Sequence, residues 1–429
     1  MKIINLNAIQ ILDSRANPTL QVDVILEDGS KGSFQVPSGA STGIHEAHEL
    51  RDENMNFYHG KSVMRAVENV LNLREKLLNQ DFTQESLDSF LIATDGSQNK
   101  EILGANAILG ISVAFAKACA MHFSLPIYEY LRRVAFKINM ENKKVRNLED
   151  IHLFANIING GLHSGNKLNI QEFMIVPTNG SPIEKIRAIS EIYHELKSII
   201  EEKYGKNDTA VGDEGGFAPS ISKAEEALNL IVEAVKKANY EGLVTIALDS
   251  AASDFYDADL KLYEVEPGLK LDYKKLSAYY SDLVAKYPIV SIEDPFAEDD
   301  FEGFAYFMNN LPTTIVQNPF NKDSKIIVVG DDLLVTNPSR ISMAMEKNLC
   351  SSLLLKINQI GTLTESLKAF SMANGAGWHT IVSHRSGETS DDFISDLAVG
   401  LSSSIKIGAP ARGERVAKYN KLLNIYSKK

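Results

Sequence analysis

The sequence predicts an α/β protein, a (β/α)8-type barrel preceded by a smaller α+β domain. Three observations lead to this prediction. The first 36 residues alternate polar and apolar side chains over three short runs, and the residues after about 150 alternate short Val-, Ile- and Leu-rich runs with amphipathic stretches. The chain of 429 residues is also long enough for both parts. We expect an N-terminal domain over residues 1–135 and a barrel with the active site over residues 140–429.

The composition of the chain excludes some classes of function. The formal net charge is −12, whereas a protein that binds a nucleic-acid backbone needs a basic face, so we expect no nucleic-acid partner. The two cysteines, Cys119 and Cys350, stand in apolar segments, which predicts buried free thiols and a reducing cytoplasm. The N-terminus lacks the pattern of a signal peptide. Lys117 interrupts the apolar stretch 107–121, which predicts a core helix and no membrane span.

The N-terminal domain is expected to begin with a sheet. Residues 3–36 predict a three-stranded meander, in which Asp28 and Gly29 form the hairpin turn between the last two strands. The loop PSGASTG (37–43) follows, small and rich in hydroxyls. It lacks the Gly-Lys-Ser/Thr ending of a Walker A motif, but a loop of this kind can close over a phosphate.

Helices are expected to complete this domain over residues 45–80, beginning with HEAHELRD, and over residues 83–134. The second range includes a long apolar helix from about Ala105 to His122. Residues 136–150 are polar and rich in Lys and Asn, which predicts a linker at the domain boundary.

The barrel is expected to begin with two strands, in HLFANIINGG (152–161) and QEFMIVP (171–177). An amphipathic helix over residues 182–204 follows and ends at Gly205. From there short apolar runs and helical stretches alternate to about residue 405, which predicts a parallel sheet with helical crossovers.

Three carboxylates stand at the ends of apolar runs in this region: Asp249, Glu293 and Asp331. They are roughly 40 residues apart, the length of one strand and one helix, so we expect them at equivalent places on different strands. Three acids at one barrel mouth repel one another unless a cation neutralises them, and an all-oxygen set suits Mg²⁺ or Mn²⁺. The alternative is that individual acids only cap the helices that follow.

Two further apolar runs end in groups that can bind an anion or transfer a proton. Lys356 follows three leucines; beside metal ions its pKa can fall, so that it acts as a base, whereas the alternative is a surface lysine. His384, Arg385 and Ser386 follow TIVS. The planar guanidinium and the hydroxyl suit a phosphate or a carboxylate, and the alternative is a structural turn.

Other polar residues near predicted strand ends are candidates on the same grounds. They are His163 after Asn159-Gly160-Gly161, Glu172 at the start of a strand, Glu214 in VGDEGG (211–216), and Lys406 near the last strand. Each of these taken alone is also compatible with an ordinary solvated turn.

In order along the chain, these strings closely resemble the enolase family, the glycolytic 2-phosphoglycerate hydro-lyases. The resemblance extends from residue 13 to residue 420, and it implies the enolase variant of the barrel. The matching strings are PSGASTG, NIINGG.H..N, QEFM, GDEGGFAP, LD.AAS.FY, IEDPFAEDD, GDDL.VTNP, LLLK.NQIGT, SHRSGET.D and GAPAR.ER.AKYN.

The resemblance implies a Mg²⁺-dependent, reversible dehydration of 2-phosphoglycerate to phosphoenolpyruvate through an enolate intermediate. It implies two Mg²⁺ ions, the second bound with substrate, and their ligands Asp249, Glu293, Asp331 and, for the second ion, Ser41. It implies Lys356 as general base and Glu214, assisted by Glu172, as general acid.

The resemblance also implies the residues that contact the substrate. His163 corresponds to a catalytic histidine that touches the substrate, and Glu172 and Lys356 lie beside it. Arg385 and Ser386 correspond to phosphate contacts. The remaining expected contacts are His384 and, at the carboxylate, Lys406.

Two departures from the family pattern bear on these roles. Ala16 stands in DSRANPT where the family usually has glycine, which strains the backbone if φ is positive there. The stretch GLSSSIK is one residue shorter than usual before Lys406, which leaves the placement of that lysine open.

Alternatives remain beside the enolase prediction. A racemase or lactonising relative on the same barrel fits less well, because such relatives lack the phosphate cluster. A non-enzymatic scaffold of the same fold is the second hypothesis, including a secreted or surface protein that binds plasminogen through Lys428 and Lys429. The family suggests a homodimer or a higher homo-oligomer.

Overall fold

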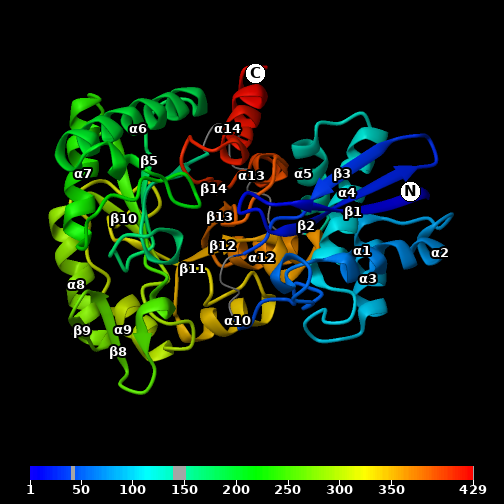
Figure 1. The fold of residues 1–429 in the computed structure, drawn as a ribbon, viewed down its shortest axis with the longest axis horizontal. Helices are drawn as coiled ribbons and strands as arrows, with labels where there is room; N and C mark the ends of the chain where they lie inside the picture. Colours follow the sequence, from blue (N-terminus) through cyan, green and yellow to red (C-terminus); the bar gives the residue numbers. More distant parts are fainter. Residues whose placement is uncertain (40–43, 139–150, 429) are drawn as a thin grey trace.

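The computed structural model describes residues 1–39, 44–138 and 151–428. Ser41 and most of the expected linker 136–150 lie outside these residues, and the expected domain boundary stays a prediction. The chain begins with an antiparallel sheet in the order β1-β2-β3, formed by β1 (Ile3–Leu12), β2 (Pro18–Leu26) and β3 (Lys31–Gln35), as predicted (Figure 1). The turn between β2 and β3 is closed by Gly29, whose amide donates to the Leu26 carbonyl at 2.9 Å and whose φ is 86°.

Five helices lie on the N-terminal side of the molecule: α1 (Met64–Asn72), α2 (Arg74–Leu77), α3 (Gln84–Asp95), α4 (Ala105–His122) and α5 (Ile127–Ile138). Helix α4 packs directly on the sheet, where a Cβ on Gly32 of β3 would lie 1.9 Å from the Ala114 carbonyl oxygen. Among the helices described, α4 is long and apolar enough to cross a membrane by length and composition, but 83% of it is buried inside the fold. This burial favours the predicted core helix.

The prediction of a helix at HEAHELRD is wrong, because residues 45–52 are not helical. Tertiary hydrogen bonds use the backbone groups that a helix needs. The His48 amide donates to the Asn99 carbonyl at 2.7 Å, and the His48 carbonyl accepts from the Ala105 amide at 2.8 Å. The Ala47 amide donates to the Gln359 carbonyl at 2.8 Å, which ties this segment to the barrel.

Eight strands close the predicted barrel in the spatial order β10-β11-β12-β13-β14-β4-β5-β6. Their bounds are β4 (Leu153–Asn159), β5 (Glu172–Pro177), β6 (Val244–Asp249), β10 (Ile289–Glu293), β11 (Ile327–Gly330), β12 (Ser352–Leu355), β13 (His379–Ser383) and β14 (Ser404–Lys406). The barrel is filled by apolar side chains, so that its centre is a packed core. These are Phe154, Met174, Val176, Ala247, Ile327, Val329, Leu354 and Ile381.

Helices surround the strands, as Figure 1 shows. They are α6 (Pro182–Tyr204), α7 (Ala224–Lys237), α8 (Tyr273–Lys286), α9 (Phe301–Asn309), α10 (Pro338–Lys347), α11 (Ile357–Ile360), α12 (Leu363–Gly375), α13 (Phe393–Leu401) and α14 (Gly413–Tyr426). Helix α6 ends at Gly205, as predicted. A small sheet of β7 (Tyr256–Asp257), β8 (Leu262–Glu266) and β9 (Leu269–Leu271) stands apart from the barrel.

Strand β5 is the exception to the parallel arrangement of the barrel, because it runs antiparallel to both β4 and β6. The chain between β4 and β5 contains no crossover helix, only residues 160–171 with a single 3-10 turn over Gly161–His163. A parallel neighbour is usually reached through a crossover helix. The first residue of β5 therefore lies at the same end of the barrel as the last residues of the parallel strands.

Candidate active site

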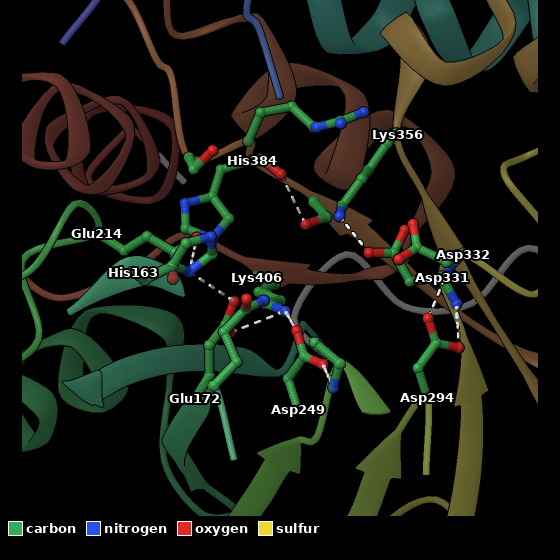
Figure 2. Close-up of a pocket in the computed structure, with 15 residues that line it drawn as sticks. His163, Glu172, Glu214, Asp249, Asp294, Asp331, Asp332, Lys356, His384 and Lys406 are labelled. Carbon is green, nitrogen blue, oxygen red and sulfur yellow. Dashed lines mark hydrogen bonds and ion pairs between the residues drawn. The ribbon is translucent and has the colours of Figure 1, made fainter. Parts of the chain in front are cut away.

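The predicted site residues meet at one mouth of the barrel, because they occupy the ends of neighbouring strands. Asp249 is the last residue of β6 and Glu293 the last of β10, and the two are direct cross-strand partners. Glu172 begins the reversed strand β5 and pairs with Asp249 from the other side. Asp331 directly follows β11, and Lys406 ends β14. Figure 2 shows that the side chains of Glu172, Asp249, Asp331 and Lys406 gather at a common cavity, together with those of Lys356 and His384.

The residues that line this cavity include several that were not predicted as site residues. The cavity is lined by every predicted site residue that the structure describes except Glu293, which is buried and accepts a hydrogen bond from Lys406. Further lining residues are Gln171, Ala251, Asp294, Asp332 and Ser383. Asp294 could have been found from its place directly after Glu293.

Lys406 is the centre of the acid cluster. Its ammonium lies 2.8 Å from Glu172 Oε2, 3.0 Å from Asp249 Oδ2 and 2.9 Å from Glu293 Oε1. Burial alone would lower the pKa of Lys406, but these carboxylates outweigh it and raise the pKa well above its usual range. The shorter stretch before Lys406 has therefore not removed it from the mouth.

Lys356 is paired with Asp331, and their side chains form a direct hydrogen bond. Two opposing effects act on the pKa of Lys356. Burial lowers this pKa, but the Asp331 carboxylate outweighs burial, and the pKa is raised. The amide of Gln359 donates to the second oxygen of Asp331 at 2.8 Å, which fixes the carboxylate. Lys356 is therefore protonated as long as Asp331 keeps its full charge.

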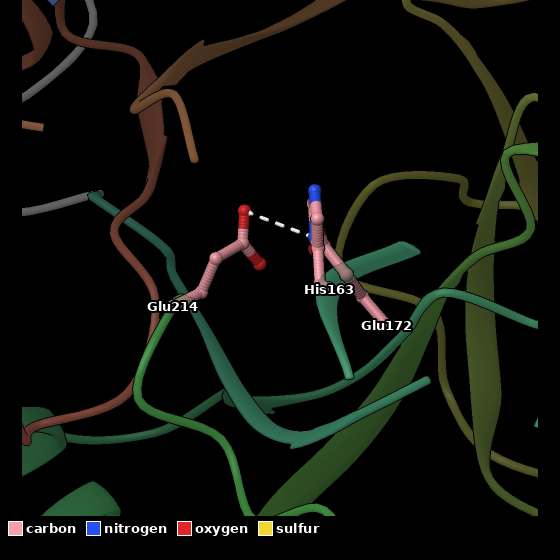
Figure 3. A group of neighbouring side chains, drawn as sticks. All are labelled: His163, Glu172 and Glu214. Carbon is pink, nitrogen blue, oxygen red and sulfur yellow. Dashed lines mark ion pairs between the residues drawn. The ribbon is translucent and has the colours of Figure 1, made fainter. Parts of the chain in front are cut away.

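A second cluster joins His163, Glu172 and Glu214, as Figure 3 shows. His163 Nδ1 lies 3.5 Å from Glu214 Oε1 and 3.9 Å from Glu172 Oε1. Burial and the charge of Glu214 raise the pKa of Glu172 well above its usual range. Burial would also raise the pKa of Glu214, but His163 and Lys406 outweigh it and hold that pKa well below its usual range. The two carboxyl groups thus differ in proton affinity, as acid–base pairs do.

The predicted anion-binding residues meet side chains from the N-terminal part of the chain. The Arg385 guanidinium makes a bidentate pair with Glu46, with contacts of 3.0 and 3.1 Å. Arg15 donates from Nη1 to the Ser386 hydroxyl at 3.2 Å. Glu46 is not among the predicted site residues, because it lies in a segment for which a helix was expected.

The donors in this mouth fit an oxygen-preferring divalent cation. Asp249 and Glu293 already converge on one positive charge, the Lys406 ammonium. Asp294, Asp331 and Asp332 offer oxygens that all lie within 4.8 Å of one another. Buried carboxylates without sulfur ligands suit Mg²⁺, Mn²⁺ or Ca²⁺ better than softer metals. The predicted ligand Ser41 lies outside the described residues.

Comparison with known proteins agrees with this geometry. Residues 3–131 match the family described as the N-terminal domain of enolase, and residues 152–428 match the C-terminal TIM barrel domain of enolase. The chain belongs to the enolase family. Enolase 1 of Entamoeba histolytica is 48% identical over 440 residues, covering 99% of this chain and 96% of its own. An enolase of Methanocaldococcus jannaschii is 50% identical over 420 residues, covering 97% and 93%.

Membership of the enolase family has direct consequences for the function. The chain is a carbon–oxygen lyase, a phosphopyruvate hydratase, and the family implies a divalent metal. The predicted fold class is confirmed, with a closed barrel and a smaller N-terminal unit. The roles of the individual side chains remain predictions.

Proposed function

We propose that this enolase-family protein dehydrates 2-phosphoglycerate reversibly to phosphoenolpyruvate with Mg²⁺ as its metal, as a step of glycolysis and gluconeogenesis. The observation that supports this most is the meeting of acids, lysines and an arginine fork at one barrel mouth. The substrate has a carboxylate, a phosphate and a hydroxyl leaving group, and each finds a matching group there.

Asp249, Glu293 and Asp331 would hold the tighter Mg²⁺, and Ser41 would contribute to the second ion, which binds with substrate. When bound, Mg²⁺ neutralises the acid cluster and stabilises the negative charge that develops on the substrate carboxylate. The Lys406 ammonium, which now lies among these acids, is then available to a substrate carboxylate.

Lys356 would remove the C2 proton and leave an enolate. Its proton is held by Asp331, so the pKa of Lys356 falls once the Asp331 charge is neutralised, and the free amine becomes a base. Lys356 directly follows the leucine-rich strand β12 and lines the cavity in which the substrate would bind.

Glu214, assisted by Glu172, would donate the proton with which the C3 hydroxyl leaves as water. The pKa of Glu172 is raised well above its usual range and that of Glu214 is lowered, so Glu172 holds a proton more readily in the free protein and would pass it to Glu214. His163 lies between the two carboxyl groups and would contact the substrate. Arg385 and Ser386 would bind the phosphate, and His384 would add a hydrogen bond.

The test is the rise in absorbance at 240 nm as phosphoenolpyruvate forms from 2-phosphoglycerate, with Mg²⁺ and with EDTA. We expect Mg²⁺-dependent turnover in the wild type and a loss of about 10³-fold or more in Lys356→Ala, because removal of the base leaves no proton acceptor. Lys286→Ala is a matched control. Lys286, the last residue of helix α8, is an exposed lysine that pairs with Glu225 of helix α7. No turnover by folded, Mg²⁺-saturated wild type would overturn the proposal and favour a non-enzymatic scaffold.

Other properties that we propose from the resemblance are a homodimer or higher homo-oligomer and a cytoplasmic location. A secondary role in plasminogen binding, at the cell surface or after secretion, would depend on the C-terminal lysines. Sedimentation and plasminogen capture by a variant that lacks Lys428 and Lys429 test these properties separately from turnover.

A further inference from the structure

Arg415, the third residue of helix α14, is fully buried and reaches the chain segment that follows β13. Nη1 donates to His384 Nδ1 at 2.8 Å and to the Arg385 carbonyl at 2.6 Å. Nη2 donates to the Ser386 carbonyl at 2.8 Å and to the Asp213 carbonyl at 3.1 Å. The Arg415 guanidinium thus makes hydrogen bonds to all three predicted substrate contacts that follow β13, although Arg415 is not itself a predicted site residue.

The contact with His384 determines where the proton of the imidazole lies. A guanidinium only donates hydrogen bonds, so His384 Nδ1 must accept one with its lone pair. A histidine whose Nδ1 is unprotonated is neutral and has its proton on Nε2. Burial of His384 and the positive charges of Arg415 and Lys406 outweigh the opposing charge of Glu214, and together they lower the pKa of His384 well below its usual range.

The protonated nitrogen has no hydrogen-bond partner among the residues that the structure describes. His384 Nε2 is buried and points toward Glu214 Oε1 at 3.4 Å, but the geometry is not that of a hydrogen bond. His384 and Glu214, toward which Nε2 points, both line the cavity (Figure 2). A buried N–H without an acceptor costs free energy, and an oxygen of the ligand would remove that cost.

We propose that Arg415 is a positioning residue that holds His384 as the neutral Nε2–H tautomer, so that His384 donates a hydrogen bond to an anionic oxygen of the substrate. His384 then transfers no proton during turnover. This inference rests on the proposed function for the identity of the substrate, but the tautomer itself is a property of the free protein.

The tautomer can be measured directly by ¹⁵N NMR of histidine-labelled protein at pH 7. The chain has nine histidines, and His384→Gln identifies the signals that belong to His384. We expect a protonated Nε2 and an unprotonated Nδ1 in the wild type, and a shift of the Nε2 signal when Mg²⁺ and 2-phosphoglycerate are added. In Arg415→Met we expect a mixture of tautomers. An Nδ1–H tautomer or an imidazolium in the wild type would overturn the proposal.

Arg412→Met is the matched control for this measurement. Arg412 lies three residues earlier, and it donates to the Ser14 carbonyl at 2.7 Å and pairs with Glu414, with no contact to His384. We expect its His384 signals to be those of the wild type. A change as large as that of Arg415→Met would mean that the tautomer depends on the packing of this chain segment and not on the Arg415 hydrogen bond.

A double-mutant cycle tests whether Arg415 acts on substrate binding through His384 or through the carbonyls of Asp213, Arg385 and Ser386. In the wild-type background we expect Arg415→Met to raise KM for 2-phosphoglycerate by about tenfold, the loss of one hydrogen bond to an anion, with partial rescue in Arg415→Lys. His384→Gln keeps a donor near the Nε2 position but has no Nδ1 acceptor. In that background Arg415→Met should have little further effect on KM.

Fully additive effects in folded variants, checked by circular dichroism and melting temperature, would contradict action through His384. The proposed function and this inference can fail separately. Absence of turnover in the wild type would remove the substrate assignment while the NMR result still decides the tautomer.

Discussion

Ala16 has a left-handed backbone, with φ at 58°, in the turn between β1 and β2. A Cβ in this conformation crowds the following carbonyl oxygen and costs about 1–2 kcal/mol. The neighbour Arg15 holds the Ser386 hydroxyl, so this strain lies directly beside the predicted phosphate site. The strain is part of a segment that the active site needs in one conformation.

We expect Ala16→Gly to raise the free energy of unfolding by about 0.5–1 kcal/mol. Glycine removes the crowding, but it also makes the unfolded chain more flexible, which offsets part of the increase in stability. Urea unfolding measures the change. Ala238→Gly is the control, because Ala238 has an ordinary right-handed backbone with φ at −78°, and there the same substitution should destabilise. A loss of stability in Ala16→Gly would contradict a strained Ala16.

Some features of individual residues could be predicted from the sequence, and others could not. Ala16 was singled out from its motif, and its positive φ is confirmed. Glu46 was missed, because local propensity predicted a helix over HEAHELRD, while tertiary hydrogen bonds hold that segment in a non-helical conformation. The contact between Lys406 and three carboxylates could not be predicted, since it depends on which side chains face one another across the mouth.

At the scale of elements, the packing of β3 on α4 depends on one glycine. A Cβ at Gly32 would lie 1.9 Å from the Ala114 carbonyl oxygen and 2.5 Å from the Ala118 amide nitrogen. Both are backbone atoms of α4, so no side-chain rotation can relieve the clash. The strand and the helix can approach this closely only because position 32 has no side chain.

We therefore expect Gly32→Ala to lower the free energy of unfolding by about 3 kcal/mol or more, since the helix must move away from the sheet. Gly29→Ala provides a comparison. Gly29 has a φ of 86° but open space around it, so only backbone strain of about 1 kcal/mol applies. Thermal and urea unfolding give the order of the two effects. An equal or smaller loss in Gly32→Ala would mean that the two elements separate at little cost.

The elements themselves were largely predictable where a periodic pattern was long. Helix α4 was expected from about Ala105 to His122 and has those bounds, and the meander and the strands of the barrel were found as well. The direction of β5 was not predicted, because an apolar run does not encode strand direction. A signal was present, since the segment between β4 and β5 is too polar and glycine-rich for a crossover helix.

At the scale of the whole molecule, the active site joins both parts of the chain. Glu46 and Arg15 reach the barrel mouth from the N-terminal side. Farther away, the buried Asp88 of α3 accepts from the Thr364 amide at 2.9 Å and from the Thr364 hydroxyl at 2.6 Å, at the start of α12. These buried polar contacts fix the N-terminal unit over the mouth, which places Glu46 against Arg385.

The stability of the whole protein should depend on the divalent cation, because the cation adds positive charge to an acid cluster that Lys406, Lys356 and Arg385 otherwise neutralise. In Lys406→Met the acids around position 406 lose their partner, and removal of one member of a buried ion cluster costs about 3–5 kcal/mol. We expect a lower melting temperature than that of the wild type in EDTA. We also expect a larger rise on addition of Mg²⁺, since the ion then binds acids with which no ammonium competes.

Lys418→Met separates this effect from the general cost of removing a buried lysine. Lys418 is fully buried and pairs with Glu388 at 2.6 Å and the Thr389 carbonyl at 2.7 Å, and it does not line the cavity. Its variant should melt earlier than the wild type but respond to Mg²⁺ as the wild type does. Differential scanning fluorimetry across a Mg²⁺ titration compares all three proteins without any need for turnover. An equal Mg²⁺-dependent rise in all three would mean that Lys406 and the cation do not share the carboxylates of Asp249 and Glu293, and the proposed metal ligands would have to be sought among Asp294, Asp331 and Asp332.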